Sequence, residues 1–385
     1  MVKDQYDCIV VGAGFAGISA ARLLAEHNKK VLIIDERYHI GGNSYDEVNN
    51  NGILIHPYGP HIFHTKEKRV FDFVTKFSPF VKYEHRVKGN IDGKIVPIPF
   101  NFASIEKCFD KTKANELKEL LIKQFGSNKS VSIYDLLNAS DNKLKELGSY
   151  VYEKVFAKYT AKQWGIDISQ VDKSVINRVP VVIGYSDTYF NDEYQYMPKN
   201  GFTALFNEML KHPNITLKLE TPAESILSIK DKQLYFRNEK YQGIVVFTGR
   251  LDKLFNYKYG PLPYRSIKFR FEDKKCDSYQ EAAVINYNTS EEFTRITEFK
   301  KLTGQMLKDR TTILKEFPTD FINDGNLVPC YPIKNDRNDE TYKKYLFEAT
   351  SIKGFYCCGR LAEYKYYNMD KTISRAMDVV DEILK

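Results

Sequence analysis

The chain has 385 residues and a formal net charge of +7 at pH 7, from 57 Lys and Arg against 50 Asp and Glu. A single hydrophobic core stops growing at roughly 250–300 residues, so we expect two or three structural units. The charges are scattered, which argues against nucleic-acid binding and suits either a small anionic ligand or an ordinary solvated surface. No apolar run reaches the roughly 18 residues of a membrane span, and glycines interrupt the N-terminal apolar segment, so neither a span nor a signal peptide is predicted.

Six cysteines are present: Cys8, Cys108, Cys276, Cys330, Cys357 and Cys358. None has the CxxC spacing of a metal site, and the adjacent Cys357 and Cys358 lie in an apolar run that predicts a strand. Buried free thiols in a reducing compartment fit this pattern best. The sequence therefore predicts a cytoplasmic protein without a metal site.

The N-terminal segment DCIVVGAGFAGISAARLLAEHNKKVLIIDE predicts a strand at residues 8–11, a glycine-rich turn, a helix from Phe15 and a second strand at residues 31–34. This order of strand, turn, helix and strand is typical of a Rossmann-type sheet, in which the two strands are parallel. The predicted fold class is therefore α/β.

The glycines at this turn have distinct tasks. Gly12 permits the tight turn, Gly14 lets the backbone approach a pyrophosphate, and Gly17 lets the helix pack closely on the strand. The helix N-terminus adds N–H donors and a positive dipole end, which favour an anion. Asp35 follows the second strand, where a carboxylate can accept both ribose hydroxyls and disfavours a 2′-phosphate. These residues predict a dinucleotide site.

A second glycine pair, Gly41 and Gly42, follows the acid and lets the chain turn back under the pyrophosphate. Such a pair is more typical of FAD-binding flavoproteins than of NAD dehydrogenases, so FAD is the predicted cofactor. Residues 243–250 and 354–384 each begin with a short apolar strand that ends in Gly-Arg, and we expect both strands to return to the first sheet. The later segment continues into a helix near Asp370, whose N-terminus can face the flavin.

Apolar residues at helical spacing in residues 115–125 and 144–155 predict a helical insert. The segments ITLKLE, QLYFRN and RSIKFRFED instead alternate apolar and polar residues, which predicts strands of an antiparallel sheet. The predicted organisation is an FAD-binding domain of residues 1–80, 195–255 and 335–385, a helical domain with a substrate loop of residues 100–178, and an antiparallel sheet domain for the substrate of residues 81–99, 179–194 and 256–334.

Three histidines, His56, His61 and His64, follow the glycine pair in the segment ILIHPYGPHIFHT. A zinc site fits them poorly, because no partner cysteine or HExxH motif is nearby and a Pro-Tyr-Gly-Pro turn separates the first two. A hydrogen-bonded core histidine is the simpler interpretation for any one of them. Their density beside a predicted flavin favours functional roles for His61 and His64.

Arg178, Arg295 and Arg360 stand out because their neighbours are apolar and aromatic. A planar guanidinium binds a diphosphate bidentately, so two such arginines among tyrosines predict a site for a nucleoside-diphosphate substrate. Salt bridges to nearby acids are the alternative interpretation for each arginine. Trp164, the only tryptophan, lies in the polar stretch KYTAKQWG rather than in an obvious core segment.

The stretches YGPHIFHT, KYTAKQWG, NRVPV, VINY, FTRI, PCYPI and GRLAEYKYYNMD occur in this order over essentially the whole chain, and together they resemble the UDP-galactopyranose mutase family. The resemblance implies an FAD domain joined to a helical domain and a six-stranded antiparallel sheet, with the substrate in the cleft between them. It also implies that N5 of reduced FAD attacks the anomeric carbon of the sugar as UDP leaves. The flavin–sugar adduct then opens and recloses as the furanose, UDP returns, and no net redox change occurs.

The same resemblance implies partners and site residues. A UDP-sugar is the substrate, NAD(P)H or another reductant keeps the flavin reduced, the chain forms a homodimer, and the product enters cell-surface polysaccharide. The implied catalytic residues are Arg178, which lies on a mobile loop in the family, Arg295 and His64. The implied substrate-binding residues are His85, Val155, Tyr159, Thr160, Trp164, Tyr189, Asn286, Arg295, Tyr331 and Tyr366. The implied FAD-binding residues are Gly12, Gly14, Ala16, Gly17, Asp35, Glu36, Gly42, Asn43, His61, Ile62, Arg360, Tyr367, Asn368, Met369, Asp370, Lys371 and Thr372. Trp164 would then serve a ligand rather than a core.

Two positions depart from the family pattern. Asn368 stands where bacterial members usually have aspartate, and Cys330 stands where tyrosine is frequent. An amide keeps hydrogen bonding but not charge, so the flavin potential and the preferred sugar stay open. His64 favours the galactose type over the N-acetylgalactosamine type. The alternatives are a mutase for dTDP-fucose or UDP-N-acetylgalactosamine, an amine-oxidase-like flavoprotein, and a catalytically silent FAD-fold binding protein.

Overall fold

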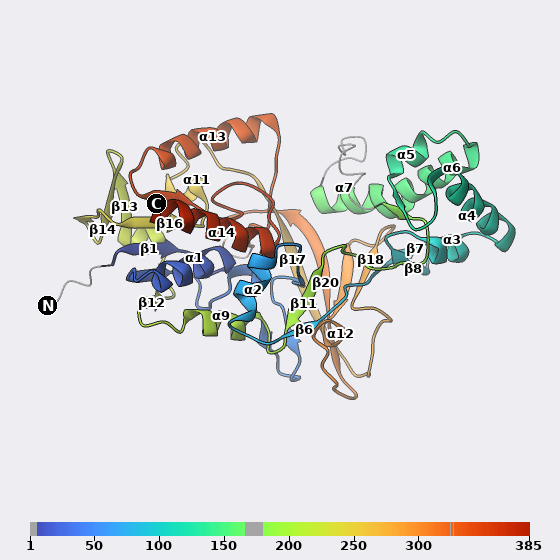
Figure 1. Ribbon diagram of the computed structural model, residues 1–385, viewed down its shortest axis with the longest axis horizontal. Coiled ribbons are helices and arrows are strands. Elements are labelled where there is room, and N and C mark those ends of the chain that lie inside the picture. Colours follow the sequence, from blue (N-terminus) through green and yellow to red (C-terminus); the bar gives the residue numbers. More distant parts are fainter. Residues whose placement is uncertain (1–5, 166–179, 324, 326) are drawn as a thin grey trace.

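The computed structural model describes residues 6–165, 180–323, 325 and 327–385. The molecule is elongated (Figure 1). An α/β lobe with the first strand and the C-terminal helix lies at one end, a large sheet lies in the middle, and a group of short helices lies at the other end. Among the described helices, none combines the length and the apolar character needed to cross a membrane.

The α/β lobe is built on a five-stranded sheet in which all neighbouring strands are parallel. In sheet order the strands are β12 (Ile215–Lys218), β2 (Val31–Ile34), β1 (Cys8–Val11), β16 (Ile244–Phe247) and β22 (Phe355–Cys357). Alternate residues of β1 enter different cores, because Cys8 and Val10 point to one face and Ile9 and Val11 to the other. A parallel sheet is covered on both faces, which explains why its inner strands are continuous apolar runs.

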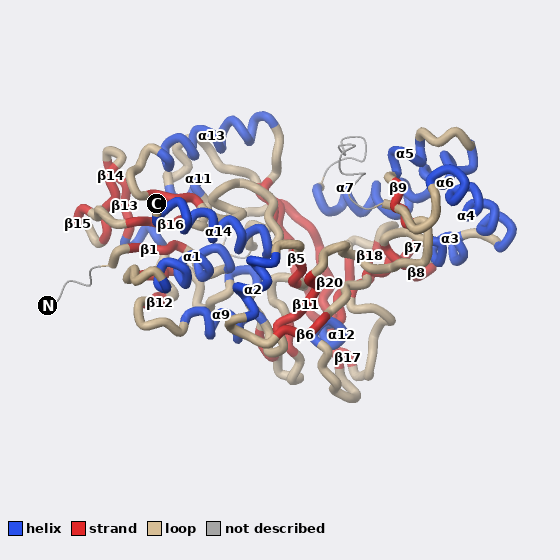
Figure 2. Tube along the Cα trace, viewed as in Figure 1, coloured by secondary structure: helices blue, strands red, loops and turns tan. Residues whose placement is uncertain are grey.

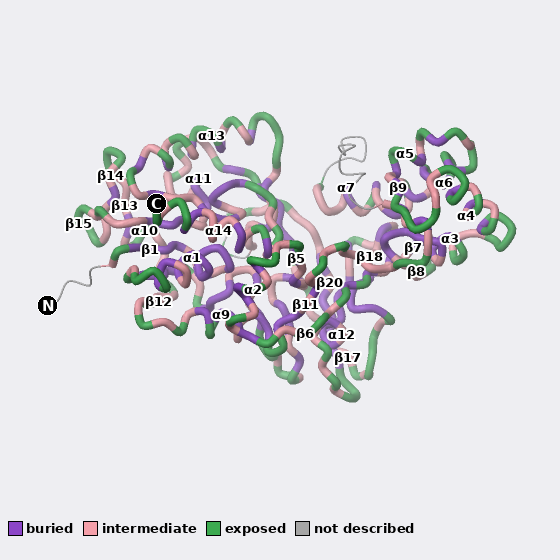
Figure 3. The backbone as a smooth tube through the Cα atoms, viewed as in Figure 1, coloured by how far each residue is buried: buried purple, intermediate pink, exposed green. Residues whose placement is uncertain are grey.

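Helices cover both faces of this sheet (Figure 2), and the buried backbone runs through its centre (Figure 3). One face carries α1 (Phe15–Glu26), α9 (Phe202–Leu210) and α14 (Met369–Leu384), and the other carries α11 (Leu251–Leu254) and α13 (Asp336–Thr350). The structure confirms the α/β class, the strands at residues 8–11 and 31–34, and the late return of two strands to the first sheet.

Two segments expected in one antiparallel sheet are placed elsewhere. ITLKLE forms β12, which pairs in parallel with β2 at the edge of the α/β sheet. QLYFRN forms β14 (Gln233–Phe236), which lies in a separate antiparallel sheet between β13 (Leu227–Lys230) and β15 (Glu239–Lys240). Alternation of apolar and polar residues indicates only that one face of a strand is exposed. An edge strand of a parallel sheet satisfies that condition as well as a strand of an open antiparallel sheet.

The central sheet has seven strands. In sheet order they are β21 (Tyr331–Pro332), β17 (Tyr264–Lys274), β20 (Thr311–Asp320), β19 (Arg295–Glu298), β18 (Val284–Tyr287), β7 (Val87–Ile91) and β8 (Lys94–Ile98). All neighbours are antiparallel except β7 and β18, which are parallel. The sheet is therefore mainly antiparallel, as expected, but it has seven strands rather than the six that the resemblance implied, and one of its pairings is parallel. Strands β7 and β18 are far apart in the sequence, so no hairpin constrains their relative direction.

The helical lobe comprises α3 (Phe102–Cys108), α4 (Lys111–Phe125), α5 (Ile133–Leu137), α6 (Asn142–Val151), a π-helical turn (Tyr152–Ala157) and α7 (Lys158–Trp164), with a short pair of β9 (Ser130–Val131) and β10 (Val181–Val182). Side chains of Asn101, Asp110, Ser132 and Asp141 cap the N-termini of α3 to α6 and satisfy free N–H groups. The apolar faces of these helices share one core with residues of β7 and β8.

Shorter elements join the lobes. A three-stranded sheet of β5 (Phe63–Thr65), β11 (Tyr194–Pro198) and β6 (Phe80–Lys82) lies between the α/β lobe and the central sheet. The remaining elements are a 3₁₀ turn (Gly42–Ser44), β3 (Glu47–Val48), β4 (Leu54–Ile55), α2 (Lys68–Thr75), α10 (Ala223–Ile226) and α12 (Phe299–Thr303). The three-domain division of the chain remains a proposal.

Candidate functional site

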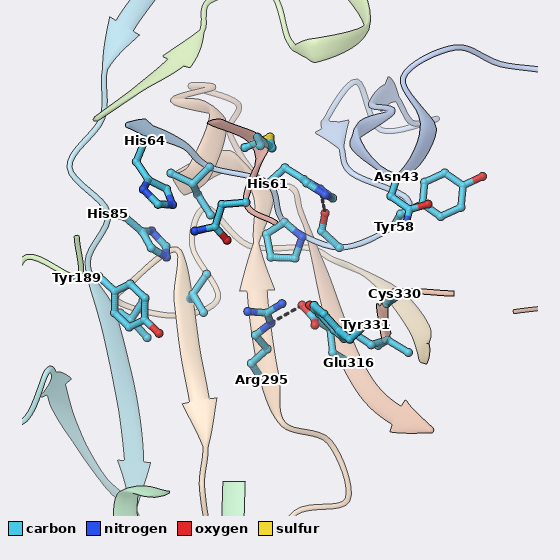
Figure 4. A pocket seen from close by; sticks show the side chains of 18 of the residues that line it. Asn43, Tyr58, His61, His64, His85, Tyr189, Arg295, Glu316, Cys330 and Tyr331 are labelled. Carbon is cyan, nitrogen blue, oxygen red and sulfur yellow. Dashed lines mark hydrogen bonds and ion pairs between the residues drawn. The ribbon is translucent and has the colours of Figure 1, made fainter. Parts of the chain in front are cut away.

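A cleft with about 1140 Å³ of empty space, part of it open to solvent, lies where the central sheet meets loops of the α/β lobe (Figure 4). Its lining includes these predicted site residues: Asn43, His61, Ile62, His64, His85, Tyr159, Tyr189, Asn286, Arg295, Tyr331, Arg360, Tyr366, Asn368 and Met369. Segments that are far apart in the sequence therefore converge on one cavity.

Other predicted residues lie outside this lining. Gly12, Gly14, Ala16, Gly17, Asp35, Glu36 and Gly42 lie at the β1–α1 turn, the end of β2 and the adjoining 3₁₀ turn. Tyr367, Asp370, Lys371 and Thr372 lie at and just before the start of α14, and Val155, Thr160 and Trp164 lie in the π-helical turn and α7. Arg178 lies outside the described residues.

The turn between β1 and α1 fits a dinucleotide. Gly12 has a φ of +105°, and a Cβ atom there would lie 2.0 Å from Thr248 Oγ1, while a Cβ atom at Gly17 would lie 1.8 Å from the Gly12 carbonyl oxygen. A Cβ atom at Gly14 would come no closer than 3.7 Å to any heavy atom, and Gly14 is the N-cap of α1 without a side-chain cap. Packing therefore requires Gly12 and Gly17, whereas Gly14 keeps open the space where a phosphate meets a helix N-terminus.

Asp35 is held by the same turn. Its Oδ2 accepts the N–H of Ala13 at 2.7 Å, and its Oδ1 accepts the N–H of Arg37 at 2.9 Å. A carboxylate has about four acceptor positions, so lone pairs remain for ribose hydroxyls. Glu36 is placed differently, because its carboxylate forms an exposed ion pair with Lys253 at 2.6 Å.

A polar cluster connects this turn with the cleft. The Arg37 guanidinium donates from Nη2 to Asn43 Oδ1 at 2.9 Å and lies 4.8 Å from the centre of the Tyr58 ring. The hydroxyl of Tyr58 lies 2.7 Å from Nε2 of His39. Asn43 and Tyr58 both line the cleft, so Arg37 fixes two residues of its wall. Sequence reasoning had no signal for Arg37 or Tyr58 beyond their closeness to the flavin-type motif.

The start of α14 offers backbone groups. Asn368 is the N-cap residue, yet its side chain makes no cap hydrogen bond, and it lines the cleft instead. The ammonium group of Lys371 is engaged by Glu67, and the Thr372 hydroxyl donates to the Asn368 carbonyl oxygen at 2.9 Å. The backbone N–H groups at this helix end, rather than the Lys371 side chain, are therefore suited to an anion or a polar ring edge.

Arg295 and Glu316 form an ion pair inside the cleft. They face each other on the adjacent strands β19 and β20, and Arg295 Nε lies 2.6 Å from Glu316 Oε1. Burial alone would lower the pKa of Arg295, but the Glu316 carboxylate keeps that pKa well above its usual value. Because Nε makes this contact, the remainder of the guanidinium faces the cleft (Figure 4). The sequence did not predict Glu316, since only the strand register places it opposite Arg295.

The histidines have different surroundings. Nδ1 of His56 accepts the backbone N–H of His61 at 3.0 Å, and its ring packs between Phe202 and Phe299, so His56 is a core residue. Nδ1 of His61 lies 2.8 Å from the Gly59 carbonyl oxygen and therefore carries a proton, which leaves Nε2 as an acceptor. Burial lowers the pKa of His56 and of His61 to about 3, so both rings are neutral at pH 7.

Aromatic rings form another wall of the cleft. Tyr331 and Tyr366 stack with ring centres 5.6 Å apart, and Trp164 lies 6.4 Å from Tyr331. The Arg360 guanidinium lies 5.0 Å from the Tyr366 ring, and it donates to the carbonyl oxygens of Cys330 at 2.9 Å and Tyr367 at 2.5 Å. Arg360 therefore links the residue before β21 to the segment before α14, and its guanidinium packs against the ring of Tyr366.

Tyrosine hydroxyls in the cleft stay protonated. Burial raises the pKa of Tyr159 to about 12 and raises the pKa of Tyr189 and Tyr331 as well. Neutral hydroxyls donate hydrogen bonds to an anion without repelling it. Val155 and Thr160, from the same lobe as Tyr159, are buried instead, and neither lines the cleft.

Several lining residues had not been predicted: Tyr58, Gly59, Pro60, Val87, Phe190, Ile267, Val284 and Glu316. Residues 58–60 belong to the Pro-Tyr-Gly-Pro turn between His56 and His61, and Phe190 is adjacent to Tyr189. Their closeness to predicted residues was the available signal. The other residues are apolar or charged strand positions, which the sequence alone does not distinguish from ordinary core positions.

Comparisons with known proteins agree with this arrangement. The family model of UDP-galactopyranose mutase matches residues 154–366, more than half of the chain, and that of an NAD(P)-binding Rossmann-like domain matches residues 10–77. A UDP-galactopyranose mutase of Mycoplasma genitalium is 37% identical over 393 residues, covering 99% of this chain and 95% of the relative. A dTDP-fucopyranose mutase of Escherichia coli is 35% identical over 379 residues, covering 98% of both chains.

A solved structure supports the fold. The crystal structure of a reduced UDP-galactopyranose mutase superposes with a TM-score of 0.72 at 15% identity, covering 99% of this chain and 94% of that chain. The full-length relatives and the family model confirm the resemblance that the motifs carried. The chain belongs to the UDP-galactopyranose mutase family.

Proposed function

We propose that this protein is an FAD-dependent isomerase that interconverts UDP-galactopyranose and UDP-galactofuranose. Family membership supports the reaction class, and a cleft with tyrosines and arginines supports a nucleotide sugar as the substrate. The observation that carries the proposal is the Arg295 guanidinium, which Glu316 fixes among neutral tyrosine hydroxyls. A preorganised cation with neutral donors suits a diphosphate that gains charge as it leaves the sugar.

The residues present fit FAD. The β1–α1 turn with Gly12, Gly14 and Gly17 would hold the pyrophosphate, Asp35 the adenosine ribose, and Asn43 with the backbone at the start of α14 the flavin half. When bound and reduced, FAD would supply a nucleophilic N5 for a transient bond to the anomeric carbon. The chain would orient the sugar, bind the departing UDP and keep it near for its return.

The substrate-binding groups have separate tasks in this proposal. Arg295 binds the diphosphate, and the hydroxyls of Tyr159, Tyr189 and Tyr331 donate to phosphate or sugar oxygens. Trp164 extends the aromatic wall, which explains its position in a polar stretch. The proposal also includes Arg178 as a second diphosphate ligand, NAD(P)H or a related reductant, a cytoplasmic homodimer, and a product that enters cell-surface polysaccharide.

Anaerobic incubation with UDP-galactofuranose, with and without dithionite, tests the function. UDP-galactopyranose is measured by chromatography, and we expect conversion only after the flavin is reduced. Consumption of the sugar nucleotide by the oxidised protein, with stoichiometric reduction of the flavin and an oxidised product instead of UDP-galactopyranose, would contradict the proposal and favour an oxidase. The Glu316→Gln variant provides a partially active reference, and a protein stripped of FAD provides the inactive one.

A mutase for another nucleotide sugar is the second candidate. The relative from Escherichia coli named dTDP-fucopyranose mutase is nearly as similar as the UDP-galactopyranose mutases, and the Asn368 side chain faces the cleft as a neutral amide. Parallel assays with UDP-galactofuranose and dTDP-fucofuranose distinguish the two substrates by the ratio of kcat/KM. A ratio in favour of the dTDP sugar would replace the proposed substrate while keeping the reaction class.

A further inference from the structure

His64 belongs to a unit of four residues, which are His64, Phe190, Asp192 and Gln195. In strand β5 it lies opposite Gln195 of β11, in antiparallel register. Gln195 is buried, and its Nε2 donates to the carbonyl oxygens of Phe190 at 3.2 Å and Asp192 at 3.1 Å. These two bonds fold residues 190–192 back toward β5, so the position of this turn is set by the strand pair that carries His64.

The folded-back turn holds the His64 ring on two sides. The Phe190 ring stacks on the imidazole with a centre separation of 3.7 Å and an angle of 14° between the planes. Oδ2 of Asp192 lies 2.9 Å from Nδ1, and both side chains are largely shielded from solvent, at 12% exposed for His64 and 18% for Asp192. Stacking fixes the ring plane, and the carboxylate fixes the rotation within that plane.

The hydrogen-bond chemistry determines which nitrogen carries the proton. An ionised carboxylate only accepts hydrogen bonds, so Nδ1 is the donor, and in a neutral ring Nε2 then keeps a free lone pair. His64 lines the cleft, and Figure 4 shows its ring beside that of His85. No hydrogen bond from another described residue occupies Nε2.

We propose that Asp192 is a positioning residue, which holds His64 in the Nδ1–H tautomer and directs the Nε2 lone pair into the cleft to accept an O–H or N–H of the bound ligand. This inference rests on the proposed function, because the ligand is the sugar or the flavin of that reaction. Gln195 and Phe190 complete the unit by holding the turn and the ring plane.

Two further titratable groups face His64 from other segments. Asp370, in the first turn of α14, is 6% exposed, and its Oδ1 has no hydrogen-bond partner among the described residues. His85 is neutral, because burial lowers its pKa to about 3. Neither makes a hydrogen bond to the His64 ring in the described structure, so Asp192 sets the tautomer.

A carboxylate in the same segment offers a matched control. Asp187 forms an exposed ion pair with Arg86 at 3.0 Å and does not line the cleft. Asp187→Asn removes the same charge as Asp192→Asn but leaves the His64 unit intact. Exposed pairs of this kind contribute little to stability, so the control protein should keep its activity and its melting temperature.

The kinetic test uses five proteins in the reduced holoenzyme form: the unchanged chain, Asp192→Asn, His64→Ala, the double variant of these two, and Asp187→Asn. We expect Asp192→Asn to lower kcat about 10- to 100-fold, the loss that corresponds to one hydrogen bond to a charged group, with KM changed by less than about threefold. In the His64→Ala background the second substitution should add less than about a twofold effect, because both act through one ring. An equal loss in both backgrounds, or the same loss in Asp187→Asn, would overturn the inference.

A spectroscopic test needs no turnover. With ¹⁵N-labelled histidine, the ring resonances of His64 are assigned by their absence in His64→Ala, and they report which nitrogen carries the proton. We expect the Nδ1–H tautomer in the unchanged holoenzyme and a shift toward Nε2–H in Asp192→Asn. An Nε2–H tautomer in the unchanged protein would overturn the inference even if the mutase assay succeeds. A third outcome is that His64 has the expected tautomer but the protein converts neither UDP-galactofuranose nor dTDP-fucofuranose. That outcome would support the orientation of His64 by Asp192 and would overturn the proposed function.

Discussion

At the scale of single residues, the buried carboxylate of Glu316 is the partner that makes Arg295 useful. Glu316 is 1% exposed and touches Nε of Arg295, which leaves the rest of the guanidinium for a ligand. We expect Glu316→Gln to lower kcat/KM roughly 10- to 100-fold, because the cation is no longer fixed toward the diphosphate. The free energy of unfolding should fall by about 1.5–3 kcal/mol, the range for hydrogen bonds to charged groups.

Asp320 on the same strand provides the comparison for Glu316. Its carboxylate pairs with Arg265 but is 76% exposed and lies away from the cleft. Asp320→Asn should therefore leave kcat/KM unchanged, as measured with the reduced enzyme. If both variants lose activity equally, the loss reflects strand β20 as a whole rather than the orientation of Arg295.

His56 gives stability a dependence on pH. Burial lowers its pKa from 6.5 to about 3, so below pH 6.5 the unfolded chain binds a proton that the folded chain does not. Stability from this residue is full above pH 6.5 and falls as the pH drops toward 3, by roughly 2 kcal/mol at pH 5. We expect His56→Asn, whose amide oxygen can still accept the N–H of His61, to melt with a shallower pH dependence between pH 7 and 5. The exposed His27 serves as control, and a His27→Asn variant that flattens the profile equally would contradict this assignment.

At the scale of elements, α7 is held against the central sheet by the ammonium group of Lys162 in its last turn. Nζ of Lys162 donates to the carbonyl oxygens of Tyr287 at 2.7 Å, Glu291 at 2.9 Å and Phe293 at 3.3 Å. The loop that receives these bonds leads directly into β19 and Arg295. One ammonium group therefore couples the helix with Trp164 to the strand with Arg295.

Removing this ammonium group should loosen α7. We expect Lys162→Met to lower the free energy of unfolding by about 1–3 kcal/mol, because three partly buried carbonyl oxygens lose their charged donor. Amide hydrogen exchange of residues 152–164 should become faster, and KM for the nucleotide sugar should rise. The exposed Lys158 in the first turn of the same helix supplies the control. Unchanged exchange in Lys162→Met would show that the helix is held by its apolar contacts alone.

At the scale of the whole molecule, the proposed FAD site draws on segments from both ends of the chain. The β1–α1 turn, Asn43, Arg360 and the start of α14 converge there, and Arg360 also binds the carbonyl oxygen of Cys330 next to β21. A ligand at this site should therefore stabilise the α/β lobe and its junction with the central sheet together.

Removal and return of the cofactor tests this coupling. Adding FAD at 100 times its Kd should stabilise the stripped protein by about 2.7 kcal/mol and raise its melting temperature. FMN, which lacks the adenosine half, should stabilise it less, because it cannot contact Asp35. If Asp35→Asn responds to FAD as the unchanged chain does, the carboxylate plays no part in binding the ribose.

Local patterns in the sequence were sufficient for the first motif. The strands Cys8–Val11 and Val31–Ile34 have the predicted boundaries, and the helix Phe15–Glu26 begins at the predicted residue, because apolar periodicity and glycine placement act over a few residues. The motif stretches also determined the family, since they recur in a fixed order along the chain. The same motif stretches contain most of the residues that line the cleft, but they gave no distances between these residues.

Only the tertiary structure determined which strands pair and which side chains contact one another across the chain. The parallel pairing of β12 with β2 and of β7 with β18, Glu316 opposite Arg295, and the Asp192 contact with His64 all join positions that are distant in the sequence. The apolar and polar pattern of a segment fixes its element and its buried face, but it is the same for many strand orders and registers. Packing of the complete core selects one of them, and that selection places the charges of the cleft.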